Sequence, residues 1–317
     1  ERFFGEYTKE EYLSLEEDKF QKIVCAYLAE YAVKYFGEEQ LESNSFTYRL
    51  KTILDNVMYL MKHIMEELSQ SEFFVADCEL KIGEDIPSYT IVLPDGHKIA
   101  VCGSVDRVDI MQRADITYLR IIDYKTGKKQ FKLSDILYGI NLQMLLYLHS
   151  IEASGGDKYG EIVPAGILYM PATVPYISSD SLKSIDKLPD ELNKELKMNG
   201  LLLKDTEIIH GMDKTDVATY IPVKIKAGEP VSSTSLATLA EFGKIFKKVD
   251  MLIAEMGKNI YNGNIEAKPL KGGHDSCEHC PYDSVCAYRQ SNPITCFSVD
   301  NKTVIEEITN EINGKEE

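Results

Sequence analysis

The hydrophobic periodicity of the chain changes at Glu72, and this change restricts the possible folds more than any other feature. Before it, apolar residues recur every three or four positions, which predicts two long amphipathic helices over about 14–35 and 50–68. Ser14 to Glu17 has the form of a capping box for the first of them. After Glu72, short segments rich in β-branched and aromatic residues predict strands over 73–82, 89–93, 97–110 and 117–124.

A second helical region follows the strands. A basic, glycine-containing loop spans 125–132, Ser134 is expected to cap a helix that runs to about Ile151, and 162–170 is expected to be the last core strand. Helices on both sides of such a strand series predict an α/β fold in which helices flank a mixed sheet. The polar stretch 172–232 has the character of an insertion, and helical periodicity returns over 236–260.

Composition and charge exclude several classes of protein. No run of eighteen apolar residues exists, so the sequence predicts no membrane span, and it shows no secretory signal. Seven cysteines, an odd number without the spread of a disulfide framework, favour a reducing, cytoplasmic setting. A net charge of −16 argues against a general nucleic-acid coat protein but permits DNA chemistry at a site that holds a divalent metal. The chain opens without Met, so we expect a fragment of a longer protein.

The densest chemical signal lies in two successive strands. Asp106 interrupts an apolar strand, and the next strand ends in Asp123 and Lys125, which point to the same face at strand spacing. With Asp106 on a neighbouring strand, the three side chains would form an oxygen-rich site suited to Mg²⁺, with Lys125 placed to orient water and to stabilise charge on a phosphate. The alternative is a surface ladder of cross-strand ion pairs.

Two further groups of residues support phosphate chemistry. Gln143 and Tyr147 share one face of the predicted helix, where both can hydrogen-bond a phosphate or a metal-bound water. The segment 120–132 is locally basic in an acidic chain, which predicts a DNA-contacting patch. Its members are Arg120, Lys128, Lys129 and Lys132.

A cysteine module lies near the end of the chain. Cys277, Cys280 and Cys286 follow a C-x2-C-x5-C spacing, which is typical of a bound metal or metal cluster. Zinc is one possibility, since His274, His279 or Cys296 could complete a tetrahedral site. We expect the remaining thiols, Cys25, Cys78 and Cys102, to be small core residues.

Together these motifs resemble the RecB-type branch of the PD-(D/E)XK nuclease superfamily. The resemblance rests on Glu79, the Gly103–Asp109 strand, Ile122–Gly127, Gln143-x-x-x-Tyr147 and the cysteine module, and it covers nearly the whole chain. It implies a restriction-endonuclease-like fold. The patterns along the chain divide it into a helical segment 1–70, a nuclease core 71–171, an insertion 172–232 and a C-terminal helix and cysteine module 233–317. The resemblance also implies that the catalytic groups are Glu79, Asp106, Asp123, Lys125, Gln143 and Tyr147.

The cofactors and partners are implied by the same resemblance. Mg²⁺ would bind Asp106, Asp123 and the carbonyl of Tyr124, and a [4Fe–4S] cluster would bind Cys277, Cys280 and Cys286. The family's metal-binding His and fourth cluster Cys have no match here, and both are expected upstream of Glu1. His63 is not taken as that His, because it lies in the wrong context and is expected to be a surface or interhelical residue.

The expected activity is that of an exodeoxyribonuclease domain of a helicase–nuclease subunit that acts in double-strand break repair, pairs with an AddA-type helicase and cuts the 5′-terminated strand. No P-loop pattern is present, so no ATP hydrolysis is expected of these residues. Two alternatives remain: a free-standing Cas4-like or phage-type exonuclease, and a catalytically silent DNA-binding module.

Overall fold

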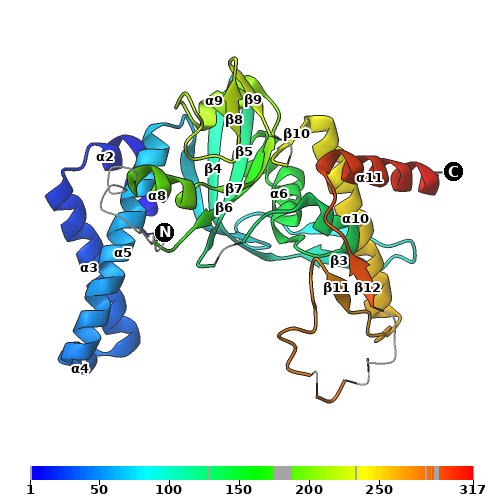
Figure 1. Ribbon diagram of the computed structural model, residues 1–317, viewed down its shortest axis with the longest axis horizontal. Coiled ribbons are helices and arrows are strands. Elements are labelled where there is room, and N and C mark those ends of the chain that lie inside the picture. The colour runs from blue at the N-terminus through cyan, green and yellow to red at the C-terminus, as the bar shows by residue number, and fades with distance from the viewer. Residues whose placement is uncertain are drawn as a thin grey trace.

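A six-stranded mixed sheet forms the centre of the molecule (Figure 1). The computed structural model describes residues 2–127, 129–174, 188–232, 234–282, 284–286, 288 and 293–316. The strand order is β1-β4-β5-β6-β7-β10, with one parallel pair, β5–β6, in the middle and another, β7–β10, at the edge. The strands are β1 (Phe74–Ile82), β4 (Gly103–Arg113), β5 (Ile116–Lys125), β6 (Glu161–Pro171), β7 (Asn199–Leu203) and β10 (Leu236–Ala237). The expected mixed sheet flanked by helices is therefore confirmed.

Helices before the sheet form an arm to one side of it in Figure 1. They are α1 (Arg2–Glu6), α2 (Lys9–Leu13), α3 (Glu17–Phe36), α4 (Glu38–Leu41) and α5 (Asn44–Ser69). The predicted capping box at Ser14 is wrong, because Ser14 ends α2 and donates its hydroxyl to the carbonyl of Glu11 at 2.8 Å. The capping box lies six residues earlier, where Thr8 and Glu11 each bond the other's backbone N–H.

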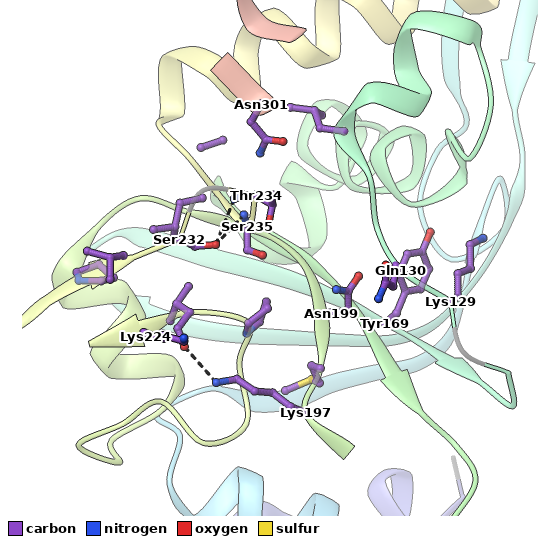
Figure 2. Close-up of a pocket in the computed structure, with 18 of the residues that line it drawn as sticks. Lys129, Gln130, Tyr169, Lys197, Asn199, Lys224, Ser232, Thr234, Ser235 and Asn301 are labelled. Atoms are coloured by element: carbon purple, nitrogen blue, oxygen red, sulfur yellow. Dashed lines mark hydrogen bonds between the residues drawn. The ribbon is translucent and has the colours of Figure 1, made fainter. Parts of the chain in front are cut away.

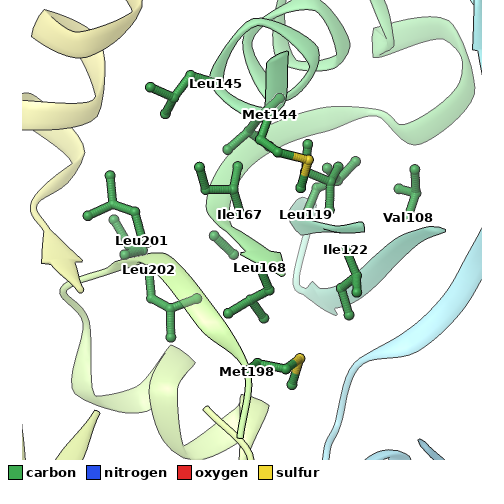
Figure 3. Packing of buried hydrophobic residues seen from close by; sticks show 14 of the residues in the cluster. Val108, Leu119, Ile122, Met144, Leu145, Ile167, Leu168, Met198, Leu201 and Leu202 are labelled. Atoms are coloured by element: carbon green, nitrogen blue, oxygen red, sulfur yellow. The ribbon is translucent and has the colours of Figure 1, made fainter. Parts of the chain in front are cut away.

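Both faces of the sheet are packed (Figure 3). On one face Leu119 and Ile167 lie beneath Met144 of helix α6 (Gln143–Ser154), which contacts β1, β5 and β6. On the other face lie Ile122, Leu168 and Leu202. Burial on both sides explains why residues 119–123 of β5 are all buried, without the alternation of a strand that has one face in solvent.

The connection between β5 and β6 differs from expectation. The single helix predicted from Ser134 to Ile151 is wrong: a 3-10 helix, η1 (Leu133–Tyr138), ends at Gly139 with a φ of 68°, and α6 begins only at Gln143. The left-handed residue at Gly139, followed by Asn141 at a φ of 54°, turns the chain so that Gln143 starts a new helix. Helix α7 (Gly156–Tyr159) then leads into β6.

Two further expectations about strands are corrected. The strand predicted over 97–110 is two strands, because β3 (Lys98–Val101) forms a separate hairpin with β2 (Tyr89–Val92) and β4 starts anew at Gly103. Residues 162–170 are not the last core strand, since β7 and β10 extend the sheet beyond β6. Helix α9 (Thr206–Met212) and a hairpin of β8 (Lys224–Lys226) and β9 (Glu229–Val231) lie between β7 and β10 in the chain. Helix α8 (Leu188–Leu196) precedes β7.

The C-terminal part begins with the long helix α10 (Leu239–Tyr261), which confirms the periodicity predicted over 236–260. A genuine capping box between Thr238 and Glu241 starts it. The cysteine module lies between the short paired strands β11 (Leu270–Gly272) and β12 (Ile294–Cys296), and α11 (Asn301–Glu316) packs on α10. Within the described ranges, no helix is long and apolar enough to cross a membrane.

Candidate active site

Asp106 and Asp123 lie opposite each other on neighbouring strands. The antiparallel ladder pairs Arg107 with Ile122, so its register places Asp106 of β4 beside Asp123 of β5, on the same face. The backbone N–H of Tyr124 donates to Asp106 Oδ2 at 2.9 Å, which fixes that carboxylate against β5. The two acids singled out in the sequence are thus brought together.

The row of polar residues continues across the sheet. β5 pairs Asp123 with Tyr169 of β6, and β6 pairs Tyr169 with Asn199 of β7. On the other side, Cys78 pairs with Arg107 and Leu80 with Val105, which leaves Glu79 of β1 opposite Asp106. The row that crosses five strands is therefore Glu79, Asp106, Asp123, Tyr169 and Asn199.

Lys125 lies at the end of β5, on the same face as Asp123. Its ammonium forms an ion pair with Asp123 Oδ2 and lies 5.8 Å from the centre of the Tyr169 ring. Tyr169 was not recognised in the sequence, where an aromatic residue near the end of a strand carries no functional signal. Burial, with Asp123 and Asp135 nearby, raises the pKa of Tyr169 to about 12, so its hydroxyl stays protonated and able to donate.

Glu79 occupies an irregular position in β1. Its φ is 54°, a left-handed conformation that is uncommon for a residue with a side chain, and Ser104 donates to its Oε2 at 2.8 Å. The strained backbone and the hydrogen bond together aim this carboxylate along the row towards Asp106. The structure therefore brings Glu79 close to the two aspartates, while its predicted catalytic role stays a prediction.

Gln143 and Tyr147 lie one turn apart on α6, with Gln143 Nε2 3.5 Å from the Tyr147 hydroxyl. The Tyr147 hydroxyl packs on the first residue of β4: a Cβ at Gly103 would lie only 2.2 Å from it. A side chain at this position would collide with the phenol unless Tyr147 moved, so glycine allows the close approach. This contact places the helix motif next to the strand that carries Asp106.

The electrostatic environment fits a divalent cation. Burial raises the pKa of Asp106, and the nearby Asp123 and Glu79 carboxylates raise it further, against the opposing effects of the Tyr124 N–H and Lys125. Asp123 is only 7% exposed, and its Oδ2 has no hydrogen-bond partner besides the Lys125 ion pair. A buried carboxylate oxygen that is paired only with a lysine and lies next to a second carboxylate is a suitable Mg²⁺ ligand.

The metal site would not be a cage of protein side chains. Among the described residues, no three His, Cys, Asp or Glu side chains are gathered closely enough to hold one metal ion. Mg²⁺ usually binds one or two carboxylates, waters and substrate phosphate oxygens, so Asp106 and Asp123 suffice for it.

A fully buried ion network lies on the opposite face of the same strands. Arg107 forms two 2.7 Å hydrogen bonds with Asp109, and Arg120 donates to Asp109 at 3.0 Å and to Glu67 of α5 at 2.6 Å. Arg107 also donates to the Tyr124 hydroxyl at 3.3 Å. Two cations and two anions balance each other here, as a buried group of charges requires.

Arg120 is therefore not a DNA contact, which corrects the prediction. Its side chain is 0% exposed, because residues at even positions of β5 point away from the face that carries Asp123. The sequence pattern near Arg120 is basic, but counting charge along a strand ignores the face to which each side chain points. Of the other predicted contacts, Lys129 is half-buried, Lys132 is exposed, and Lys128 lies outside the described residues.

Lys129 is held near the active site by the fold. Its ammonium lies 5.0 Å from the centre of the Tyr169 ring, and the N–H of nearby Phe131 donates to the side chain of Asn199. The basic loop is thus attached to β6 and β7, and Figure 2 shows Lys129, Gln130, Tyr169 and Asn199 together. A contact of Lys129 with DNA stays a prediction.

The cysteines do not form a metal-binding group in the described part of the chain. Cys277 and Cys280 are half-buried and Cys286 is exposed, while Cys296 is buried, and burial raises the pKa of its thiol. Neither the cluster nor the zinc site, with His274 or His279, is supported by this arrangement. Cys102 is exposed, and Cys25 and Cys78 are half-buried, so they are not the core residues expected.

His63 is not a surface residue either. It is 7% exposed, its ring lies 5.4 Å from that of Tyr220, and burial lowers the pKa of its imidazole. Besides Tyr220, which follows β7, His63 contacts the backbone of Leu196 at the end of α8, so it packs α5 against α8 and a remote part of the chain.

The chain belongs to the PD-(D/E)XK nuclease superfamily, whose family model matches residues 1–287. The B-subunit of the ATP-dependent helicase/deoxyribonuclease from Thermoanaerobacter sp. (strain X514) is 37% identical over 246 residues, which are 76% of this chain and 21% of that protein. The proteins of the same name from Alkaliphilus oremlandii and Alkaliphilus metalliredigens are 35% identical over 275 residues and 33% identical over 304 residues. These matches cover 83% and 92% of this chain and 24% and 26% of the two relatives. The chain thus spans about a quarter of the length of the curated relatives it matches.

Proposed function

We propose that this chain is the nuclease domain of a helicase–nuclease subunit of the AddB type and that it hydrolyses DNA phosphodiesters with Mg²⁺. The observation that carries the proposal is the placement of Asp106 and Asp123 side by side, with Lys125 on the same face and ion-paired with Asp123 Oδ2. The relatives support it, since each is named as the B-subunit of an ATP-dependent helicase/deoxyribonuclease.

Asp106, Asp123 and the carbonyl of Tyr124 would hold the cation. Bound there, Mg²⁺ would supply Lewis acidity to the phosphate and lower the pKa of a coordinated water. Lys125 is placed to exchange its ion pair with Asp123 for a phosphate oxygen or the attacking water, where a cation stabilises developing negative charge. Tyr147 and Gln143, beside Gly103, can donate to the same phosphate, and Glu79 can orient water next to Asp106.

The finer expectations belong to the same proposal. We propose exonucleolytic cleavage of the 5′-terminated strand during double-strand break repair in the cytoplasm, with an AddA-type helicase as partner. We also propose that Cys277, Cys280 and Cys286 ligate a [4Fe–4S] cluster whose fourth thiolate comes from outside these 317 residues. Their spacing and the resemblance support this, and no catalytic step depends on the cluster.

The test is a cleavage assay on single-stranded DNA labelled at either end, with Mg²⁺ and with EDTA. The wild-type chain should cut only with Mg²⁺, and Asp106→Ala should lose cleavage by at least about 10²-fold while binding the strand with nearly unchanged affinity. A matched control is Asp115→Ala, which removes an acid from the turn between the same two strands.

The outcomes separate the alternatives. Stepwise loss of label from one end identifies an exonuclease and its polarity. Cleavage by Asp106→Ala within a few-fold of wild type would remove Asp106 from the site. Tight DNA binding without cleavage by the wild type in any divalent metal would identify the catalytically silent module instead.

A further inference from the structure

A large cavity opens beside the candidate active site and is strongly basic. Its volume is about 1240 Å³, and Lys125 and Tyr169 of the active-site face belong to its wall. Eight lysines and two glutamates are the charged residues that line it within the described part of the chain. In the whole sequence, 51 acidic residues outnumber 35 basic ones, so the cavity reverses the charge balance of the molecule.

The lysines of the wall come from segments far apart in the sequence. Lys194 lies on α8, Lys204 directly follows β7, Lys224 and Lys226 lie on β8, and Lys302 lies on α11. Lys194, Lys204, Lys224 and Lys226 are exposed, and no ion pair involves them among the described residues. One of the two glutamates, Glu241, is already engaged as the capping-box partner of Thr238. Most of the positive charge in the cavity is therefore not neutralised by the protein.

The scaffold that carries these lysines is held in place. Lys197, which is half-buried, donates to the carbonyls of Ala218 at 2.6 Å and Val223 at 3.1 Å, just before β8 (Figure 2). Thr206 of α9 donates to Glu229 of β9 at 2.6 Å. Lys224 and Lys226 are two residues apart on a strand and share one side of it, so the hairpin presents two ammonium groups together. A solvated charged surface would not need such anchoring.

The remaining lining suits phosphate oxygens. Ser232, Thr234, Ser235 and Asn301 surround the cavity in Figure 2, and side chains of these types are common phosphate ligands. Tyr169 is buried, with 4% of its surface exposed, and the Lys125 and Lys129 ammonium groups lie 5.8 Å and 5.0 Å from the centre of its ring, so two cations lie where the cavity meets the candidate active site. A positively charged groove that follows the backbone is typical of sites that bind a single strand through its phosphates.

We propose that this cavity binds several consecutive backbone phosphates of a single DNA strand, on one side of the bond to be cut. This inference rests on the proposed nuclease function, because it takes the ligand to be the substrate strand. The cavity is only slightly larger than the pockets of about 300–1,000 Å³ that hold small ligands, so it accommodates a few nucleotides of one strand and not a duplex.

The experiment measures equilibrium binding of oligothymidylates of increasing length over a range of salt, without metal, so that no cleavage occurs. The variant is Lys224→Ala/Lys226→Ala, since both side chains are exposed and Lys197, which supports the hairpin, is left intact. The matched control is Lys22→Ala/Lys51→Ala, two exposed lysines on the helical arm at the side of the sheet (Figure 1).

For the cavity variant we expect Kd to rise several-fold at about 0.1 M salt and the slope of log K against log salt to fall by about 1.4, or about 0.7 for each phosphate that is no longer neutralised. The control should keep the wild-type slope. Equal slopes for the wild type, the cavity variant and the control would overturn the inference. Equal losses of DNA affinity in the cavity variant and the control would also overturn it, because they would indicate diffuse attraction of DNA to the whole surface.

Two further measurements separate this inference from the proposed function. If the wild type cuts DNA with Mg²⁺ and the cavity variant binds and cuts like it, the cavity assignment fails and the nuclease assignment stands. If the wild type does not cut DNA and the cavity variant alone binds it more weakly, the nuclease assignment fails and the cavity assignment stands. A competing RNA strand of equal length that displaces the DNA at equal concentration would overturn the choice of DNA.

Discussion

The backbone N–H of Tyr124 holds Asp106 Oδ2 at 2.9 Å, while the Tyr124 hydroxyl on the other face of the sheet accepts a 3.3 Å hydrogen bond from Arg107. One residue of β5 thus links the acidic row to the buried ion network. Because Arg107 is itself held by Asp109 and Glu67, the strand register that aligns Asp106 with Asp123 is supported from behind. The network therefore supports the position of the two carboxylates of the candidate site from the opposite face of the sheet.

The first prediction separates Lys125 from its basic neighbours. Lys125→Ala should lower kcat by about 10²–10³-fold, because the ammonium next to Asp123 acts on charge that develops in the transition state. Lys132 is an exposed residue of the same loop, so Lys132→Ala should chiefly raise the Kd for DNA and reduce the slope of log K against log salt by about 0.7. Single-turnover cleavage and binding titrations measure both. Identical behaviour of the two variants would remove the special role of Lys125.

The second prediction concerns the buried network. Arg120→Ala should lower the free energy of unfolding by about 3–5 kcal/mol, because Asp109 and Glu67 would be left as buried charges with one cation fewer. Lys132→Ala is the matched control and should change it by less than about 0.5 kcal/mol. Urea denaturation followed by circular dichroism measures both. A stable Arg120→Ala protein that binds DNA more weakly would instead favour Arg120 as a DNA contact.

The third prediction concerns a histidine that joins α6, β2 and α10. His149 Nε2 lies 3.2 Å from both Tyr89 and Asp250, Nδ1 lies 3.4 Å from Glu152, and the ring stacks on Phe246 at 4.6 Å. Burial lowers the pKa of His149, but the hydrogen bonds and charges of Asp250 and Glu152 outweigh it and raise the pKa to about 9.

A pKa raised on folding stabilises the protein fully below the unfolded value of about 6.5, and this contribution is lost as the pH rises through about 9. We expect the free energy of unfolding of the wild type to fall by at most about 3 kcal/mol across this window relative to His149→Gln. Urea denaturation at about pH 6, 7.5 and 9.5, on both sides of that window, checks it. A difference between the two proteins that does not change with pH would contradict a charged His149.

The fourth prediction concerns the cysteine module, whose three thiols are not gathered in the described residues. The chain alone should contain little iron and should be a weak nuclease, whereas a protein extended upstream towards the length of its relatives should hold about four iron atoms and cut faster. Iron and sulfide analysis and the cleavage assay compare the two. A stoichiometric cluster in the chain alone would return Cys296 to consideration as the fourth ligand.

The sequence by itself determined most of the helices and core strands and pointed to the residues of the candidate site. Period-2 and period-3.6 patterns are local properties, so the helices before Glu72, the strands of the core and α10 could be predicted, as could the shared face of Asp123 and Lys125. The short-range motifs also identified Asp106, Gln143 and Tyr147. Local patterns failed to predict where helices begin and end, because hydrophobic periodicity does not specify these points. One example is the capping box placed at Ser14, and another is the break between η1 and α6, which depends on left-handed residues at Gly139 and Asn141.

Only the tertiary structure decided what packs against each face of the sheet and which distant segments meet. Arg120 and Lys125 lie five residues apart on one strand, yet the first is buried against Glu67 of α5 and the second lines the basic cavity. The alternation of side chains along the strand puts the two residues on opposite faces, but what covers each face depends on the packing around the sheet, which a charge count does not contain. The cavity likewise exists only because α8, β8 and α11 bring their lysines to Tyr169, and the interactions that do so connect residues far apart in the chain.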